Sequence, residues 1–447
     1  MNNFESYVPV LRKALRKMDA WRLSFGDTNS VIEHDDAELE KVLKELQKRL
    51  EGNYPFHHPQ YAGQMLKPPH PVAWLAYSLA MTINPNNHAF DGGPPTSEME
   101  KETVNSLAEM AGYQNPFLGH LTSGGTIANL EALFVAREIH PGKKIAATSQ
   151  AHYTHRRMCR VLNVPFLEIP VDENGSPDLD FLESHAKEIG TLVVTSGTTG
   201  LGRIEPLKQL IDLAEKHHFR IHTDAAYGGF FKIIFDSDDW NALSRSDSIV
   251  IDPHKHGLQP YGCGSVLFRD PSVGKFYKHD SPYTYFTSED LHLGEISLEC
   301  SRAGASAAAF WATLQLLPLT KEGIGRILQK TVDAASDFAA KIQESDLFEL
   351  YETPQLDIVG YFPATGATDF SEISRASQKI FKSGMEDREN GFHLSLYKIP
   401  AHEFNARFPK YKNDSDSVTI LRSTFMKPEH EAFIPELISR LHKLSKS

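Results

Sequence analysis

The segment DSIVIDPHKHGLQPYGCGSVLF, residues 247–268, places a lysine between two histidines shortly after an apolar run. Residues 249–251 (IVI) are consecutive β-branched residues, which is typical of a strand buried on both faces of a parallel sheet. Pro253 ends this strand because proline cannot donate to the hydrogen-bond ladder. Lys255 therefore follows the carboxyl end of a strand, where open α/β sheets bind ligands. Most lysines in turns are simple surface residues, but a partly desolvated one is a nucleophile toward carbonyl compounds.

Length, charge and cysteine content bound the class of protein. The 447 residues suffice for two or three domains, and the net charge of -12 argues against a general nucleic-acid binder. Three well-separated cysteines, Cys159, Cys263 and Cys300, imply neither a disulfide framework nor a cysteine metal site. The longest apolar stretch, PVAWLAYSLAM from Pro71, is too short to span a bilayer, and no signal peptide is recognisable. We therefore expect a soluble, cytoplasmic protein that binds neither nucleic acid nor membrane.

Alternating strand and helix signals between residues 76 and 310 predict an α/β fold with a mostly parallel central sheet and helices on both faces. KKIAATS, TLVVTSG and FRIHTDAA are strand-like, and PLKQLIDLAEKHH reads as a crossover helix. Residues 1–75 form a predicted N-terminal helical segment whose leucine spacing suits packing against a second subunit. A long helical stretch from Ala303 to about Ser345, then LDIVGYF and SVTILRSTFM as strands, predict a small C-terminal α+β domain over 311–447.

Three further stretches bring chemical groups to the same predicted sheet edge. A helix begins near Gly125 and Thr126, where free N–H groups attract an anion such as phosphate, although many glycine-rich helix starts bind nothing. Asp224 ends the strand in FRIHTDAA and alone could be a metal ligand, a helix cap or a partner for a cationic ring nitrogen. His152 follows another strand; with His155 it could suggest a metal, but no third ligand has matching spacing, so we expect none.

These groups in combination match the needs of one cofactor. An anion cradle, a flat ring for stacking, a carboxylate and a lysine are what pyridoxal 5'-phosphate requires of a protein. The carboxylate keeps the pyridine nitrogen protonated, so that the ring acts as an electron sink. The same set would be a coincidence in a hydrolase or a binding module.

The chain resembles the group II pyridoxal-phosphate-dependent amino acid decarboxylases, the family of aromatic amino acid, tyrosine, glutamate and diaminobutyrate decarboxylases. DPHKHG, similar to the family's Asn/Asp-Pro-His-Lys, and HTDAAYGG carry the resemblance, which extends from HPQYAGQM to SRAGASAAAFW. It implies a type I, aspartate aminotransferase-like fold and a homodimer with active sites at the subunit interface.

The resemblance also implies which residues surround the cofactor ring. Lys255 would be the Schiff-base lysine, and Asp224 would pair with the pyridine nitrogen. His152 would stack on one face of the ring and Ala226 would pack on the other. Thr199, in SGTTGLG, matches a threonine that the family places near the cofactor and its stacking histidine.

The resemblance assigns a second set of residues to the cofactor phosphate. Gly125 and Thr126, together with His254, would bind the phosphate. Ser301 and Arg302 match the Ser-Arg/Lys-Ala-Gly segment of bacterial tyrosine decarboxylases and would reach a phosphate from the partner subunit.

Candidates for substrate contact and proton transfer come from the same comparison. The family protonates the product with a tyrosine on a mobile loop, and Tyr283 or Tyr285 in DSPYTYFTSEDLHLGE lies about the right distance beyond Lys255. The two tyrosines cannot be distinguished by sequence, because this stretch is more compact than in animal aromatic decarboxylases. His58, in HHPQYAG, resembles the histidine that helps to line the substrate pocket, and a structural histidine is the equal alternative.

The predicted activity is decarboxylation of an L-amino acid to its amine and CO2. SRAGASAAAFW favours an aromatic substrate such as tyrosine, while acidic and diamino substrates stay open. A carbon–carbon lyase is the alternative, since HKHGLQPYGCGSVLF and SRAG also resemble sphingosine-phosphate lyase. Loss of the loop tyrosine's role would instead give an aldehyde-forming, oxygen-using enzyme. A silent binding protein or a zinc hydrolase is disfavoured, since Lys255, Asp224 and His152 are all present.

Overall fold

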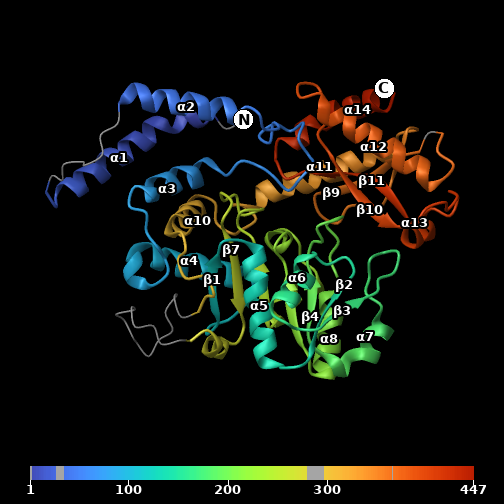
Figure 1. Cartoon of the computed structure of the whole chain (residues 1–447), viewed down its shortest axis with the longest axis horizontal. Coiled ribbons are helices and arrows are strands. Elements are labelled where there is room, and N and C mark those ends of the chain that lie inside the picture. The colour runs from blue at the N-terminus through green and yellow to red at the C-terminus, as the bar shows by residue number, and fades with distance from the viewer. Residues whose placement is uncertain (1–2, 27–34, 279–295, 365, 447) are drawn as a thin grey trace.

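The computed structural model describes residues 3–26, 35–278, 296–364 and 366–446, and its larger sheet has seven strands in the order β1-β7-β6-β5-β4-β2-β3 (Figure 1). Within the described chain only β7 runs against the other strands of this sheet, so the prediction of a mostly parallel sheet is confirmed. The strands are β1 (Leu118–Thr122), β2 (Lys144–Thr148), β3 (Phe166–Ile169), β4 (Ile189–Thr195), β5 (Arg220–Asp224), β6 (Ser248–Ile251) and β7 (Gly264–Phe268).

Both faces of this sheet are buried, which explains the continuous apolar run in β6. Ile249 and Ile251 belong to the core cluster that includes residues of α4 and α8, whereas Val250 belongs to the cluster that includes α5. Neighbouring side chains of a strand point to opposite faces, so both faces need apolar residues. The helices of this part are α3 (Pro71–Met81), α4 (Pro94–Ala111), α5 (Gly125–Ile139), α6 (Thr154–Val161), α7 (Leu179–His185), α8 (Leu207–His217), α9 (Asp238–Ala242) and α10 (Gly304–Leu316).

The C-terminal part contains a four-stranded antiparallel sheet in the order β10-β11-β9-β8. Phe338, fully buried on α11, contacts the rings of Tyr361, Phe392 and Phe425 and joins this sheet to its helices. The elements are α11 (Gly325–Gln343), β8 (Phe348–Leu350), β9 (Ile358–Pro363), α12 (Phe370–Glu386), β10 (Ser395–Pro400), α13 (Ala401–Arg407), β11 (Ser417–Thr424) and α14 (His430–Lys446).

The single long helix expected from Ala303 to about Ser345 is two helices. α10 ends at Leu316 and α11 begins at Gly325. Pro318 lies between them, and proline both lacks an N–H and clashes with the preceding helical turn. The apolar residues around Pro318 concealed this break in the sequence.

The positions expected to separate the three parts of the chain, about 75 and 310, both lie inside helices. Residue 75 is in α3 and residue 310 is in α10, and these two helices pack against each other. The division into 1–75, 76–310 and 311–447 stays a prediction.

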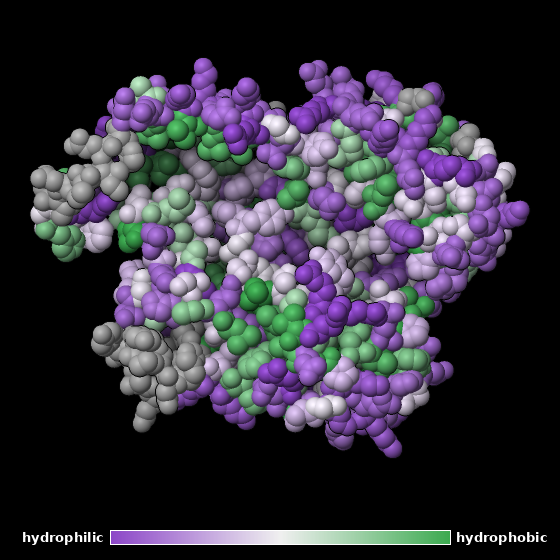
Figure 2. Space-filling model, in the orientation of Figure 1, coloured by the Kyte–Doolittle hydropathy of each residue, from purple (hydrophilic) through white to green (hydrophobic). Residues whose placement is uncertain are grey.

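The N-terminal helices α1 (Val8–Leu23) and α2 (Asp36–Leu50) extend from one side of the molecule. The apolar face predicted for α2 is uncovered within one chain: Val42 is 63% exposed and Leu43 is 53% exposed. Figure 2 shows apolar residues gathered below the polar outer edge of this region. No helix among the described residues combines the length and hydropathy needed to cross a membrane.

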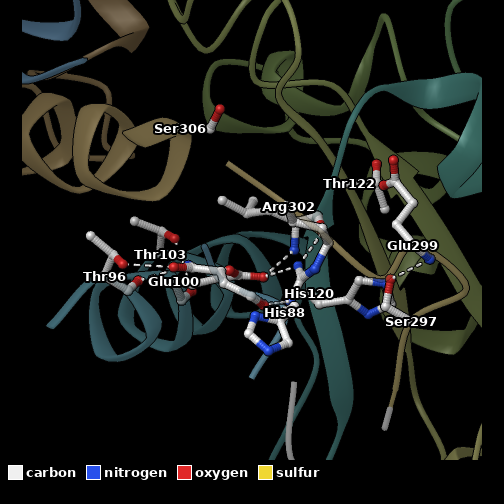
Figure 3. A network of polar contacts seen from close by, with 12 residues as sticks. His88, Thr96, Glu100, Thr103, His120, Thr122, Ser297, Glu299, Arg302 and Ser306 are labelled. Carbon is white, nitrogen blue, oxygen red and sulfur yellow. Dashed lines mark hydrogen bonds and ion pairs between the residues drawn. The ribbon is translucent and has the colours of Figure 1, made fainter. Parts of the chain in front are cut away.

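A buried polar network connects α4, β1 and the chain that follows residue 296 (Figure 3). Arg302 donates to the Glu100 carboxylate and to the carbonyls of Leu121 and Asn87, at 2.6 and 2.8 Å. Glu100 also accepts from the Leu121 N–H and the Asn87 side-chain amide. Arg302 is 8% exposed and Glu100 is 1% exposed, so neither charge has access to much water.

Replacing Arg302 with methionine is therefore expected to destabilise the fold by about 3–5 kcal/mol, since Glu100 would be left buried without its cation. The measurement is the midpoint of urea unfolding. The Glu100→Gln/Arg302→Met double variant should recover part of this loss. As a control, Arg245→Met removes an exposed ion pair with Asp212 and should cost less than about 1 kcal/mol. An Arg302→Met protein as stable as the native chain would contradict the assigned role of this pair.

Candidate active site

A cavity of about 400 Å³ lies at the carboxyl-terminal edge of the parallel strands. The segments that line it follow β1, β2, β4, β5 and β6, so the sheet brings together positions far apart in the sequence. The predicted site residues among its lining are Gly125, Thr126, His152, Thr199, Asp224, Ala226, His254 and Lys255.

Lys255 occupies the turn that follows β6. Its backbone N–H donates to the Asp252 carbonyl at 2.9 Å, and its Nζ lies 3.4 Å from Asp252 Oδ2. His254 Nε2 lies 3.5 Å from the same carboxylate oxygen. The lysine side chain is 21% exposed, so its amine is held at the cavity and is largely removed from water. Burial lowers the pKa of His254, which favours the neutral ring.

The start of α5 forms another wall of the cavity. Gly124 has φ +147°, a conformation that side-chain-bearing residues rarely adopt. A Cβ on Gly125 would lie 2.5 Å from Asp252 Oδ2, so only glycine fits there without movement of the carboxylate. Residues 123–127 all line the cavity, which places the N-terminus of a fifteen-residue helix beside it. Helix N-termini favour anions because their first N–H groups lack intrahelical partners.

Asp224 ends β5 and has a buried partner that sequence reasoning missed. His155 Nε2, on α6, lies 2.8 Å from Asp224 Oδ2, and the Ala226 N–H donates to the other oxygen at 3.2 Å. Burial disfavours the charged carboxylate, yet His155 and then Lys255 outweigh it, so the pKa of Asp224 is lowered. The sequence signal for this contact is the pair His152 and His155, which as a pair suggests only a metal site.

His152 lines the cavity across from the lysine turn. The Thr154 N–H donates to its Nδ1 at 3.2 Å, and its ring centroid lies 4.4 Å from that of Tyr153. Burial and, less strongly, Lys255 lower the pKa of His152, while Asp224 opposes the shift. A neutral, half-buried imidazole is therefore available as a flat surface at the cavity.

Arg422 connects the small C-terminal sheet to the cavity and also escaped sequence analysis. Its guanidinium, on β11, donates to the carbonyls of Thr199 at 2.8 Å, Gly200 at 2.7 Å and Gly63 at 3.1 Å. The side chain is nearly fully buried. It thus fixes the turn that carries Thr199 against the loop that follows His58.

Three of the predicted residues that the structure describes, Ser301, Arg302 and His58, do not line this cavity. Ser301 accepts a hydrogen bond from Asn86 at 3.2 Å, and its neighbour Arg302 forms a buried ion pair with Glu100. His58 packs edge-to-face on Phe433 of α14 and accepts a hydrogen bond from the Gln60 N–H. The loop candidates at 283 and 285 lie outside the described residues.

Glu205 is a buried acid that contacts Thr195, one of the residues that line the cavity. Glu205 accepts hydrogen bonds from the Thr148 hydroxyl and, at 2.6 Å, from the Thr195 N–H. Burial raises the pKa of Glu205 to about 7, against these two hydrogen bonds. In the described part of the chain no three His, Cys, Asp or Glu side chains are arranged to hold a metal ion.

The fold and the cavity define an enzyme that uses pyridoxal 5'-phosphate. A family model described as "Pyridoxal-dependent decarboxylase conserved domain" matches residues 27–362. The chain therefore belongs to the pyridoxal-dependent decarboxylase family, and it is a pyridoxal-phosphate-dependent amino acid decarboxylase of type I fold.

Similar proteins of known name agree with this assignment. The chain is 26% identical to an L-tyrosine decarboxylase of Enterococcus faecium, over 83% of this chain and 82% of the relative. It is 30% identical to a probable L-tyrosine/L-aspartate decarboxylase of Methanothermobacter thermautotrophicus, over 69% and 85%. The apo crystal structure of mouse CSAD has a similar fold, with TM-score 0.80 at 20% identity over 96% of this chain and 92% of that one.

The pKa of Glu205 predicts a specific pH dependence of stability. The folded value, about 7, lies above the usual 4.5, so the stability that Glu205 contributes is complete below pH 4.5 and is lost as the pH rises through 7. The slope is at most about 1.4 kcal/mol per pH unit. Urea unfolding of Glu205→Gln should therefore show a flatter pH profile between pH 5 and 7 than the native chain, and the exposed control Glu322→Gln should not. Parallel profiles for Glu205→Gln and the native chain would contradict the raised pKa.

Proposed function

We propose that this decarboxylase acts on L-tyrosine and releases CO2 and the corresponding amine. The names of its relatives support this substrate, because three of them are L-tyrosine decarboxylases at 23–26% identity. Several others are named probable L-tyrosine/L-aspartate decarboxylases, which makes L-aspartate the second candidate. The observation that carries the proposal is the convergence of Lys255, Asp224 and His152 on one cavity at the sheet edge.

Each side chain at the cavity has a role in this proposal. When bound, pyridoxal phosphate supplies an electron sink that accepts the electron pair of the bond that carries the carboxylate. Lys255 would hold the cofactor through its aldehyde until the substrate amine takes its place. Asp224, kept ionised by His155, holds a proton at the pyridine nitrogen. His152 stacks on one side of the ring and Ala226 packs on the other, which orients the ring relative to the lysine.

We assign the cofactor phosphate to the wall of the cavity that the start of α5 and His254 form. Gly125 and Thr126 offer backbone N–H groups at the start of α5, and His254 lies beside Gly124, 3.4 Å from the place that a Cβ would take there. Thr199 completes the lining from the turn held by Arg422. Ser301 of one subunit is proposed to complete the phosphate site of the other, since it does not line the cavity of its own chain.

Decarboxylation ends with a proton added to the α-carbon of the product. We assign this proton to Tyr283 or Tyr285, and we assign His58 to the substrate side of the site. These assignments rest on the family resemblance.

A homodimer is part of the proposal. One chain leaves apolar side chains uncovered at its N-terminal helices. They are the half-exposed leucines of α2, Val10 and Trp21 of α1, and Phe25, which follows α1. Apolar surface of this kind is typical of a subunit interface.

The direct test of the activity is CO2 release by the purified holoenzyme from single L-amino acids: tyrosine, tryptophan, aspartate, glutamate and 2,4-diaminobutyrate. Tyrosine is expected to react fastest, with its amine as the product. Release from aspartate alone would replace the proposed substrate, and release from none, with cofactor bound, would overturn it.

Lys255→Ala is expected to lose the covalent cofactor bond and to reduce CO2 release by more than about 1,000-fold, because no other amine would hold the aldehyde. Absorbance after borohydride reduction measures the bond. The matched control Lys275→Ala removes an exposed lysine and should retain both properties. Covalent cofactor on the Lys255→Ala protein would contradict the assignment.

Introducing two charges on the apolar face of α2, as Leu43→Asp/Leu46→Asp, is expected to weaken the dimer. Burial of each leucine is worth about 1.5–3 kcal/mol, so the dissociation constant should rise at least about 100-fold. Sedimentation velocity gives the oligomeric state. Lys41→Asp, on the polar side of the same helix, serves as the control. A native chain that sediments as a monomer would contradict the proposal.

A further inference from the structure

A second cavity, of about 410 Å³, shares no lining residue with the cofactor cavity. It lies between the segment that precedes α3, the lysine turn and the start of α14. Its walls are largely apolar, with prolines at 68, 69 and 428 and the side chains of Leu258 and Ile327. A cavity of this size and character is typical of a small-molecule site.

Two lysines line this apolar space. Lys427 is only 4% exposed, and its ammonium donates to the Tyr61 carbonyl at 2.6 Å. Lys67 donates to the Met426 carbonyl at 3.4 Å. An ammonium group has three donors, and a carbonyl carries no full negative charge. Across residues 3–26, 35–278, 296–364 and 366–446, neither ammonium forms an ion pair with a carboxylate.

The two charges destabilise each other in this position. Burial and, less strongly, the charge of Lys67 lower the pKa of Lys427 to about 7, against the opposing effect of Glu429. Burial also lowers the pKa of Lys67 to about 8. Buried charges are normally paired, so two cations beside one cavity lack a counter-charge.

The nearby acids do not supply that counter-charge. Asp357 acts on Lys67 at a distance, but its carboxylate accepts the Tyr227 hydroxyl and lies 3.3 Å from His256 Nε2. Glu429 is exposed at the rim and acts on both lysines without forming an ion pair.

We propose that this cavity binds a small carboxylate with an apolar body, held by the ammonium groups of Lys67 and Lys427. The carboxylate satisfies the free lysine donors, and the apolar body fills the space between the prolines and Leu258. Inorganic phosphate satisfies the lysines but leaves the apolar walls uncovered. The cavity shares no lining residue with the cofactor cavity, and the proposal does not depend on which amino acid the enzyme decarboxylates.

The test is calorimetric titration of the full-chain holoenzyme with phenylacetate, with uncharged phenylacetamide and with inorganic phosphate. Saturable binding of phenylacetate alone is expected. Equal affinity for phenylacetamide would overturn the role of the lysines, and equal affinity for phosphate would overturn the role of the apolar walls. Absence of phenylacetate binding would overturn the proposal as a whole.

Variants locate the bound anion. Lys67→Met and Lys427→Met should each weaken phenylacetate binding about tenfold, the value of one charge-assisted contact, while Lys443→Met, an exposed lysine of α14, should not. Glu429→Gln should tighten binding about twofold, because a repulsive charge is removed from the rim. If Lys427→Met fails to fold, Lys67→Met and Glu429→Gln still decide the question, since a folding defect does not increase affinity. Phenylacetate that binds all the variants equally occupies another site, such as the cofactor cavity, and would overturn the proposal.

Discussion

The arrangement of the cofactor cavity depends on the contacts of the buried Asp252 carboxylate. It lies within 3.5 Å of both Lys255 Nζ and His254 Nε2, and a side chain on Gly125 would collide with it. The Asp252 carboxylate therefore sets the distance between the turn that carries Lys255 and the start of α5. Because Asp252 directly follows β6, whose two faces are packed, its position is set by the rigid sheet rather than by a loop.

The two cavities of this protein differ in how their buried charges are paired. At the cofactor cavity, Asp224 is paired with His155, and outside the lining of that cavity Asp357 accepts the Tyr227 hydroxyl and lies near His256. These contacts keep the carboxylates in fixed positions at little cost, since each buried acid has a hydrogen-bonding partner. The second cavity presents two lysines that donate to carbonyls, and Lys427 also lies over the Tyr61 ring, but neither forms an ion pair within the described residues. This difference in charge pairing is the basis for proposing an anion at the second cavity.

Prediction from sequence succeeded where the signal was local. The IVI run, the strand before Asp224 and the crossover helix now called α8 were all recognised from periodicity, because burial on two faces or one imposes that pattern. It failed at Pro318, where apolar neighbours continued the helical pattern through a break. It also failed for Arg422, since nothing near this residue in the sequence indicates contact with the Thr199 turn, over 200 residues away.

The sequence by itself determined the class of fold, because the patterns of strands and helices are local features. It also predicted which groups would meet the cofactor, from strand ends, glycines and a lysine after a buried strand together with the family resemblance. Only the tertiary structure decided which of them share a cavity, that His155 contacts Asp224, and that Arg302 is paired with Glu100. It alone revealed Lys67 and Lys427 side by side. The physical reason is that pairing between buried charges depends on distance in space, and 360 residues of chain separate these two lysines.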